Sequence, residues 1–144
     1  MVNLKEIVNF LQKVTLFQGL KASQKELLAK RFVERTYKSG EKILTQGLGG
    51  EGFFILVTGH ADAFRMKADG TDSKVNSFGP TDFFGELALL DDGPRTASVV
   101  ASELTQCLVL TRWDFLALLK GDSDMAITIL EEVVRRFRVV LDTM

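Results

Sequence analysis

Short β-rich runs separated by turn residues occupy the middle of the chain, and this pattern constrains the fold more than any other feature. The predicted strands cover residues 41–45, 53–58, 61–66, 73–78, 97–101 and 106–111. Glycine-containing turns, such as Ala68-Asp69-Gly70 and Gly79-Pro80, separate them. Many short strands joined in this way are typical of a sandwich or barrel. We therefore expect a mainly β fold with flanking helices, centred on an antiparallel β-roll that forms either a sandwich or a barrel.

Helical periodicity replaces the β pattern at both ends. Apolar residues at three- and four-residue spacing predict an amphipathic helix over residues 4–17, and Ser23 followed by Glu26 predicts a capping box that opens a second helix. The helical period returns over residues 113–119 and 124–141. One apolar stripe runs along the last helix: Ala126, Leu130, Val133, Val134, Phe137, Val140 and Leu141. Such a helix can cross the open mouth of a barrel or pair with a copy of itself.

No repeat, low-complexity tract or linker divides the 144 residues. A chain of this length buries about two thirds of the surface that its unfolded form exposes, so one core suffices. We expect a single domain over residues 1–144. It consists of an N-terminal helical bundle (1–32), the β-roll (33–111) and the C-terminal helices (112–144).

The composition argues against several classes of function. The 18 basic and 19 acidic residues give a net charge of -1, so no global positive field attracts nucleic acid. One cysteine, Cys107, and one histidine, His60, exclude an intrachain disulfide and the usual zinc site. A metal-dependent jelly-roll enzyme would need more histidines, and we find no nucleophile elbow or Cys-His pair. We therefore predict no catalytic residues, no metal and no cofactor.

The first residues, MVNLKEIVNFLQKV, mix charges among the apolar positions. They fit neither a signal peptide nor a membrane span. With no export signal and no disulfide chemistry, we expect a cytoplasmic chain without a membrane segment.

The stretch FGELALLDDGPRTASVVA, residues 84–101, carries the chemistry. A short helical turn is expected after Gly85, and its first amide groups suit a phosphate. Gly85 lets a ligand approach the backbone closely. Arg95 offers a planar, permanently charged guanidinium that matches two phosphate oxygens. Glu86 would be repelled by a phosphate, so it suits a sugar hydroxyl or an ion pair that holds Arg95. This cradle predicts a phosphorylated sugar as the ligand.

These residues resemble the phosphate-binding cassette of the cyclic-nucleotide-binding domain family, here residues 84–98. The family includes sensors of the catabolite-activator, protein-kinase-A regulatory-subunit and cyclic-nucleotide-gated-channel types. Its pattern runs Phe-Gly-Glu, small or apolar residues, then Pro-Arg-small-Ala-Ser/Thr, and FGELALL and PRTAS match it. One departure is Glu51 in a Gly-rich turn where relatives often have Asp.

The resemblance implies roles for the matching positions. Glu86 would bind the ribose 2′-hydroxyl and Arg95 the cyclic phosphate. The rest of the cradle would be formed by Phe84 and by the backbones of Gly85, Leu87, Ala88 and Ala97. Phe78 and Ala63 would line the purine, with plain core packing as the alternative for Phe78.

Two further positions bear on the purine. The hydroxyl of Thr96 can bond a guanine amino group or the phosphate, whereas RTASV is similar to the channel branch, which favours cyclic AMP while accepting both nucleotides. We expect cyclic AMP, with cyclic GMP as a second ligand. Arg136 falls where that branch places a purine-capping arginine, with Val140 one turn further on. The alternatives for Arg136 are a solvated basic face or an interaction with the helix dipole.

The resemblance implies that the β-roll is a double-stranded jelly-roll barrel with N-terminal helices and two C-terminal helices, the last of them a lid. It also implies a regulatory sensor that binds a cyclic nucleotide and signals by movement of its C-terminal helices. No DNA-binding segment follows the last helix in this chain, so one alternative is the excised sensor of a transcription regulator. A second is a domain that has lost its ligand and serves as a protein interaction module. The expected partners are a second copy through the C-terminal helix or an unidentified effector protein.

Overall fold

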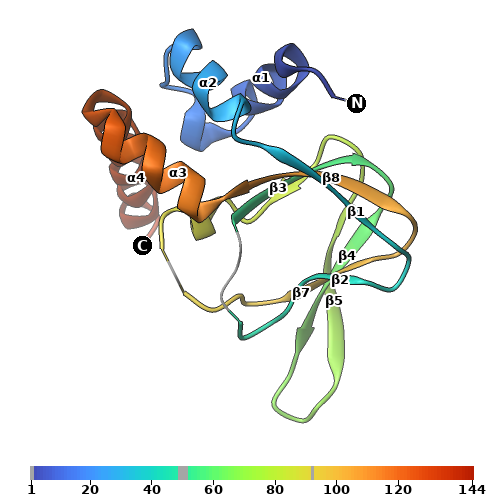
Figure 1. Cartoon of the computed structure of the whole chain (residues 1–144). Coiled ribbons are helices and arrows are strands. Elements are labelled where there is room, and N and C mark those ends of the chain that lie inside the picture. The colour runs from blue at the N-terminus through green and yellow to red at the C-terminus, as the bar shows by residue number, and fades with distance from the viewer. Residues whose placement is uncertain (1, 49–51, 92) are drawn as a thin grey trace. The chain divides into compact units, whose positions relative to one another are not determined.

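The computed structural model describes residues 2–48, 52–91 and 93–144 (Figure 1). Glu51, where the family pattern is broken, and Asp92, which belongs to the cassette, lie outside them. The chain forms two compact units, one made of Met1–Arg31 with Trp113–Met144 and the other of Phe32–Arg112. Each unit is described by itself. Whether they act as the single domain expected from the sequence stays a prediction.

The unit Phe32–Arg112 is built from two four-stranded antiparallel sheets (Figure 1). The first has the order β1-β8-β3-β6 and the second β2-β7-β4-β5. The strands are β1 (Val33–Tyr37), β2 (Lys42–Leu44), β3 (Gly52–Thr58), β4 (Ala61–Met66), β5 (Asp72–Phe78), β6 (Phe83–Phe84), β7 (Ser98–Ala101) and β8 (Thr105–Thr111). The predicted antiparallel roll is confirmed. Among the described residues no strand pairing joins the two sheets, so they do not close into a barrel.

Six strands lie where they were predicted, and two were missed. β1 has the sequence VERTY, whose charged residues give no apolar alternation, and it is recruited by pairing with β8. β6 has only two residues and depends on its pairing with β3. Both strands form because they pair with a strand that is distant in sequence. Local β propensity does not predict such pairing.

The apolar core of this unit comes from both sheets: Leu44, Phe54, Leu56, Ala61, Ala63, Phe78, Val99, Cys107 and Val109. The ring of Phe84 stacks on Phe54 with centroids 5.1 Å apart, and lies 4.8 Å from the ring of Phe78. Burial raises the pKa of the Cys107 thiol to about 11. This packing fixes Phe84, the residue immediately before Gly85.

The other unit contains helices, whose bounds are α1 (Leu4–Gln12), the 3-10 turn η1 (Thr15–Phe17), α2 (Ala22–Ala29), α3 (from Arg112 to Gly121) and α4 (Ser123–Asp142). The helix predicted over residues 4–17 therefore ends at Gln12. The predicted Ser23–Glu26 capping box is wrong, because the helix is capped at Lys21, two residues before Ser23, and the Gln24 side chain accepts a hydrogen bond from the Lys21 N–H at 2.9 Å. Phe17 and Phe115 are fully buried, with ring centroids 6.1 Å apart.

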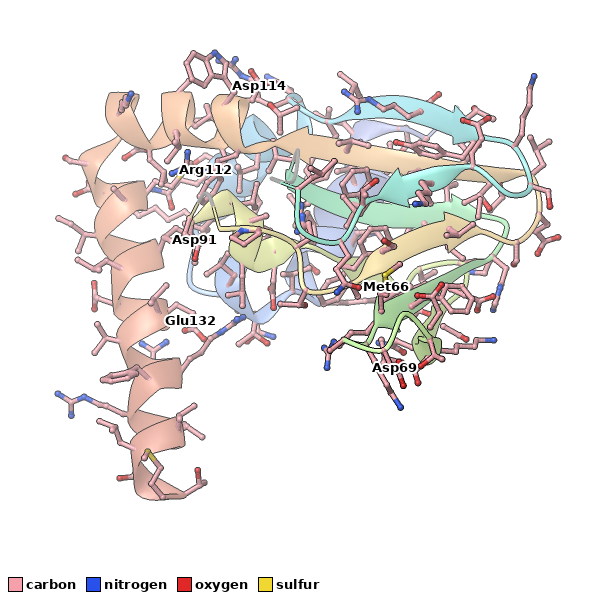
Figure 2. The ribbon with its side chains drawn as sticks, turned by 90° about the horizontal axis from the view of Figure 1, so that it is seen from below. Met66, Asp69, Asp91, Arg112, Asp114 and Glu132 are labelled. Carbon is pink, nitrogen blue, oxygen red and sulfur yellow. The ribbon has the colours of Figure 1, made fainter. Side chains whose placement is uncertain are left out.

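Helix α4 buries a different face from the apolar stripe seen in the sequence. Its buried residues are Met125, Ile129 and Glu132, the last bonded to Arg135 (Figure 2). Most of the stripe is exposed: Leu130 61%, Val134 43%, Phe137 60%, Val140 55% and Leu141 50%. Asp122 caps the helix by accepting from the Met125 N–H at 3.1 Å. None of the helices in the described ranges has the length and apolar character to cross a membrane.

Candidate ligand-binding site

The cassette begins where β6 gives way to a tight turn. Gly85 has φ +86, in the left-handed region, and a Cβ there would lie 2.4 Å from the Gly52 carbonyl oxygen. The 3-10 helix η2 (Glu86–Leu89) follows, closed by an Ala88 N–H that donates to the Gly85 oxygen at 3.1 Å. The amide of Ala88, predicted to face the ligand, is thus bonded inside the turn. Only glycine combines this backbone with so close an approach to β3.

Arg95 lies across the turn from Gly85 and is half-buried. Its Nη2 donates to the Gly52 oxygen at 2.8 Å, while its Nε is buried without a hydrogen-bond partner in the described part of the chain. Burial lowers the pKa of Arg95, and the negative charge of Asp91 acts in the opposite direction. A buried cationic donor without an acceptor is costly, and an anion at this point would remove that cost.

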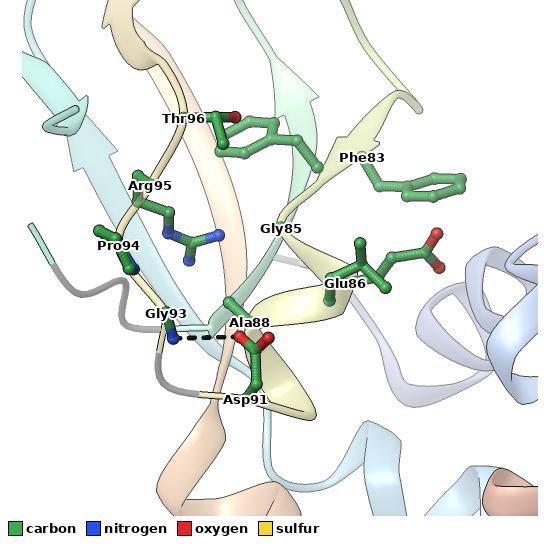
Figure 3. Close-up of a pocket in the computed structure, with 11 residues that line it drawn as sticks. Phe83, Gly85, Glu86, Ala88, Asp91, Gly93, Pro94, Arg95 and Thr96 are labelled. Carbon is green, nitrogen blue, oxygen red and sulfur yellow. Dashed lines mark hydrogen bonds between the residues drawn. The ribbon is translucent and has the colours of Figure 1, made fainter. Parts of the chain in front are cut away.

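These groups surround a cavity of about 470 Å³ (Figure 3). Seven of the predicted ligand-binding residues line it: Phe84, Gly85, Glu86, Leu87, Ala88, Arg95 and Thr96. Phe83, Asp91, Gly93 and Pro94 complete the lining. Asp91 accepts a hydrogen bond from the Gly93 N–H at 3.1 Å, which holds the turn between η2 and Arg95. The structure therefore brings the two halves of the cassette together around one space.

A second cavity, of about 330 Å³, shares Phe84, Gly85, Arg95 and Thr96 with the first. Its other lining residues include the predicted purine contacts Ala63 and Phe78, and also Ala97. Phe78 is both buried in the core and part of this lining, so its two interpretations are compatible. The two cavities meet at the Arg95 side of the cassette. The acidic side chains Glu86 and Asp91 line the first, and Ala63, Val75 and Phe78 line the second.

Two polar residues of the second cavity, Arg65 and Asn76, were missed from the sequence. Arg65 follows Ala63 by two residues on β4, and Asn76 is the β5 residue paired with Ala63. Alternation along a strand and cross-strand pairing therefore place both beside a predicted site residue. The pairing register of β4 with β5 is what indicates these two positions, and no short sequence motif encodes that register.

Glu86 extends away from Arg95 towards Phe83 (Figure 3). The Nη2 of the Arg95 guanidinium bonds to the Gly52 oxygen, and an ion pair between Glu86 and Arg95 stays a prediction. Arg136 and Val140 lie on α4, in the helical unit. Their contact with a purine stays a prediction.

The described residues show no candidate metal site. In the described ranges no group of three or more His, Cys, Asp or Glu side chains is arranged to hold a metal ion. The charged groups that line the first cavity are the Arg95 guanidinium, which can donate to an anion, and the Glu86 and Asp91 carboxylates, which can accept from hydroxyl groups.

Comparison with known proteins agrees with this geometry. Residues 34–122 match the family described as Cyclic nucleotide-binding domain. The cyclic AMP receptor protein of Thermus thermophilus is 36% identical over 85% of this chain and 57% of its own length. The cAMP-dependent protein kinase regulatory subunit of Aspergillus niger is 39% identical over 81% of this chain and 28% of its own. The chain thus spans less than two thirds of these relatives.

A solved structure gives the same result for the fold. The N-terminal domain of a transcriptional regulator from Streptomyces coelicolor superposes with a TM-score of 0.84 at 30% identity, covering 94% of this chain and 96% of that one. The family match spans more than half of the chain and includes the whole cassette. With its two antiparallel sheets and its cavity around Arg95, this chain belongs to the cyclic nucleotide-binding domain family.

Proposed function

We propose that this chain is a regulatory module that binds cyclic AMP in the two adjoining cavities. The observation that carries the proposal is the Arg95 guanidinium, which is half-buried, has an unpartnered Nε and lies where the cavities meet. The cyclic phosphate would accept hydrogen bonds from Arg95 and from the backbone near Gly85. Glu86 would accept from the ribose 2′-hydroxyl, and the purine would lie against Phe78 and Ala63.

The sizes and linings support this division. The cavity of about 470 Å³ includes Glu86, Asp91 and Arg95 in its lining, which suits the hydroxyl and phosphate groups of a sugar phosphate. The neighbouring space of about 330 Å³ includes Phe78, Phe84 and Ala63, which suit a flat base, together with Arg65 and Asn76, which can bond its polar edge. An unmet buried donor costs roughly 1–3 kcal/mol. A phosphate oxygen would recover that energy on binding, so part of the affinity is already prepared in the unbound fold.

Cyclic AMP is proposed as the preferred ligand and cyclic GMP as a weaker one. The names of both sequence relatives refer to cyclic AMP. Thr96 lines both cavities, so its hydroxyl is placed to serve either the phosphate or a guanine amino group. A single hydroxyl contact of this kind discriminates modestly, which is why both nucleotides should bind.

Signalling is proposed to be a population shift in which the nucleotide draws residues 84–97 inward and moves α3 and α4. Arg136 and Val140 would then cover the purine. The dissociation rate of cyclic AMP measures this directly. We expect faster dissociation from Arg136→Ala and an unchanged rate from Arg138→Ala, the neighbouring arginine on the same helix. Equal rates for the two variants would remove Arg136 from the site.

A second copy of the chain is the proposed partner of α4. Five apolar residues follow one another at alternating spacings of three and four, as in a coiled coil: Ile127, Leu130, Val134, Phe137 and Leu141. All are exposed by 43% or more, and Glu131 and Arg138 flank the row. Sedimentation should find a dimer for the wild type and for Leu104→Lys, which alters an equally exposed leucine elsewhere, and a monomer for Leu130→Lys. A monomeric wild type at about 100 μM would exclude a dimer of useful affinity.

Titration calorimetry with cyclic AMP and cyclic GMP tests the function itself. The wild type should bind cyclic AMP more tightly, and Arg95→Ala should lose at least about 100-fold in affinity, because a buried charge-assisted contact to phosphate is removed. Arg35→Ala, on β1 of the other sheet, is the matched control and should bind normally. If the wild type binds neither nucleotide below about 1 mM, the chain is a domain without a nucleotide ligand, and a protein interaction module becomes the better interpretation.

A further inference from the structure

The stretch that carries Arg95 precedes β7, outside the regular sheet, yet its backbone is tied to a segment far away in the sequence. The Gly47 N–H donates to the Arg95 oxygen at 2.8 Å, and the Arg95 N–H donates to the Leu48 oxygen at 2.9 Å. The Gln46 N–H donates to the Ser98 Oγ at 2.8 Å. Residues 46–48 therefore continue the pairing of β2 with β7 beyond the end of the sheet, up to the arginine itself.

The side chain of Gln46 reaches the strand on the other side of β7. The Met66 N–H, at the end of β4 (Figure 2), donates to the Gln46 Oε1 at 2.7 Å, and the Gln46 Nε2 donates to the Met66 oxygen at 3.3 Å. This reciprocal pair copies the one that two residues of an antiparallel ladder make with each other. Because β7 lies between β2 and β4 in the sheet, Gln46 joins the two neighbours of the Arg95 stretch.

Gln46 does not line either cavity that surrounds Arg95; it lines a separate hollow with Met66 and Ser98. A direct contact with a nucleotide in the cassette is therefore not its role. Its side chain makes two hydrogen bonds, both to the Met66 backbone, and they hold residues 46–48, which pair with the Arg95 backbone, against β4. The bond to the Ser98 Oγ comes from the main-chain N–H of Gln46. A guanidinium that must meet two phosphate oxygens has to be held within about 0.5 Å of its working position, and a free-ended loop does not provide this.

We propose that Gln46 is a positioning residue for cyclic-phosphate binding, which acts by fixing the backbone from Arg95 to Ser98 between β2 and β4. The inference rests on the proposed function, since it names how that site is held. It makes Gln46 and Arg95 energetically coupled. Loss of Gln46 should weaken binding only as long as Arg95 is present to be positioned.

The test is a double-variant cycle with cyclic AMP affinity as its readout, made on the whole chain. Gln46→Ala should lower affinity on the order of 10-fold, the effect of losing about two neutral hydrogen bonds. In an Arg95→Lys background the same change should alter affinity by less than about 2-fold. Gln106→Ala is the matched control, because the Gln106 side chain on β8 bonds Glu34 away from the cassette. It should bind like the wild type.

A second variant guards against loss of the fold. Gln46→Glu keeps an acceptor for the Met66 N–H and loses only the donor to the Met66 oxygen, so it replaces Gln46→Ala in the cycle if that variant melts at a lower temperature. Amide hydrogen exchange without ligand gives an independent readout. The Arg95 and Gly47 amides should exchange faster in the variant, and those of β8 should not.

The outcomes separate the two proposals. A wild type that does not bind cyclic AMP overturns the proposed function and this inference together. A wild type that binds, with Gln46→Ala binding within about 2-fold of it, overturns the inference alone. Equal losses in the Arg95 and Arg95→Lys backgrounds also overturn it, because Gln46 would then act independently of the arginine.

Discussion

The two ends of the β-roll differ in whether their polar groups have hydrogen-bond partners. Where β3 begins, at Gly52, Arg95 keeps a buried Nε without a partner in the described residues. Where β3 ends, past Thr58, the turn at His60 is closed by its own neighbours: Thr105 Oγ1 accepts from the His60 N–H at 3.2 Å and donates to the His60 oxygen at 3.1 Å. The end at His60 therefore contributes mainly to stability, and the end at Arg95 is available for binding a ligand.

At the end near His60, which we call the closed end, further polar side chains also have partners. Ser102 Oγ lies 2.7 Å from the His60 Nδ1. Asp62 accepts from the Ser77 hydroxyl at 2.9 Å and lies 3.1 Å from the Lys74 Nζ. A polar cluster whose members pair with one another has little to offer a ligand. The open end has an incomplete set of partners, which is the condition for recognising an anion.

The largest effect is expected when the same backbone strain is introduced at each end of the β-roll. Gly85 and Gly59 both have positive φ, +86 and +96, and a Cβ would meet a backbone or hydroxyl oxygen at 2.4 Å in each case. Gly85→Ala and Gly59→Ala should each lower the free energy of unfolding by roughly 2–4 kcal/mol. Only Gly85→Ala should also abolish cyclic AMP binding. Urea unfolding and calorimetry on both variants measure the two effects.

A variant of Gly59 that folds but no longer binds would contradict this separation of stability from binding. It would mean that the closed end is coupled to the cassette through the strands. A Gly85 variant with normal affinity would instead show that the left-handed turn is not needed for the ligand.

A smaller effect is expected from Thr105→Val at the closed end. Thr105 is fully buried, and its hydroxyl bonds His60 and the Glu103 oxygen. Removing the hydroxyl takes the acceptor away from the His60 N–H, while the His60 oxygen keeps the Ser102 N–H as a donor, so the free energy of unfolding should fall by about 1–3 kcal/mol. The affinity for cyclic AMP should stay within about 2-fold of the wild type. If Thr105→Val instead lost affinity and kept its stability, the Thr105 hydroxyl would serve ligand binding and this prediction would be wrong.

The smallest effect concerns pH. Burial pushes the pKa of Asp62 upward, but the Ser77 hydrogen bond and the Lys74 charge outweigh it and leave the pKa lowered. A lowered pKa in the folded state adds stability above the unfolded value, near 3.8, and this stability is lost as the pH falls through the folded pKa. The wild type should exceed Asp62→Asn by about 0.5 kcal/mol at pH 7, with the difference vanishing below about pH 3. Urea midpoints across this range measure it, and a constant difference would exclude the ionised carboxylate as its source.

The cassette was predictable from the sequence because its parts are close together in the chain and its constraints are local. Gly85 needs a left-handed backbone, and Arg95 follows ten residues later at the end of the same turn. Arg65, Asn76 and Gln46 were not predictable in this way. Each owes its place to strand register, which depends on pairing between segments that local patterns do not connect.

The last helix shows the same limit for packing. The apolar stripe along α4 was correctly read as helical, but periodicity does not say which side of a helix faces its own unit. Met125 and Ile129, on the buried side, carry less of the pattern than the exposed row that begins at Ile127. The predicted capping box at Ser23 failed because Gln24 forms the competing bond with Lys21, two residues earlier than the predicted pair.

Cys107 has a practical consequence for measuring motion in this molecule. It is the chain's one thiol, it is fully buried in β8, and with a pKa near 11 only about one molecule in a thousand carries the thiolate at pH 8. Thiol-directed probes should therefore leave the folded wild type almost unmarked. Cysteines introduced at exposed positions, as in Arg138→Cys and Thr71→Cys, would accept a pair of spin labels against a silent background. The distance between those labels, with and without nucleotide, would report how far α4 travels.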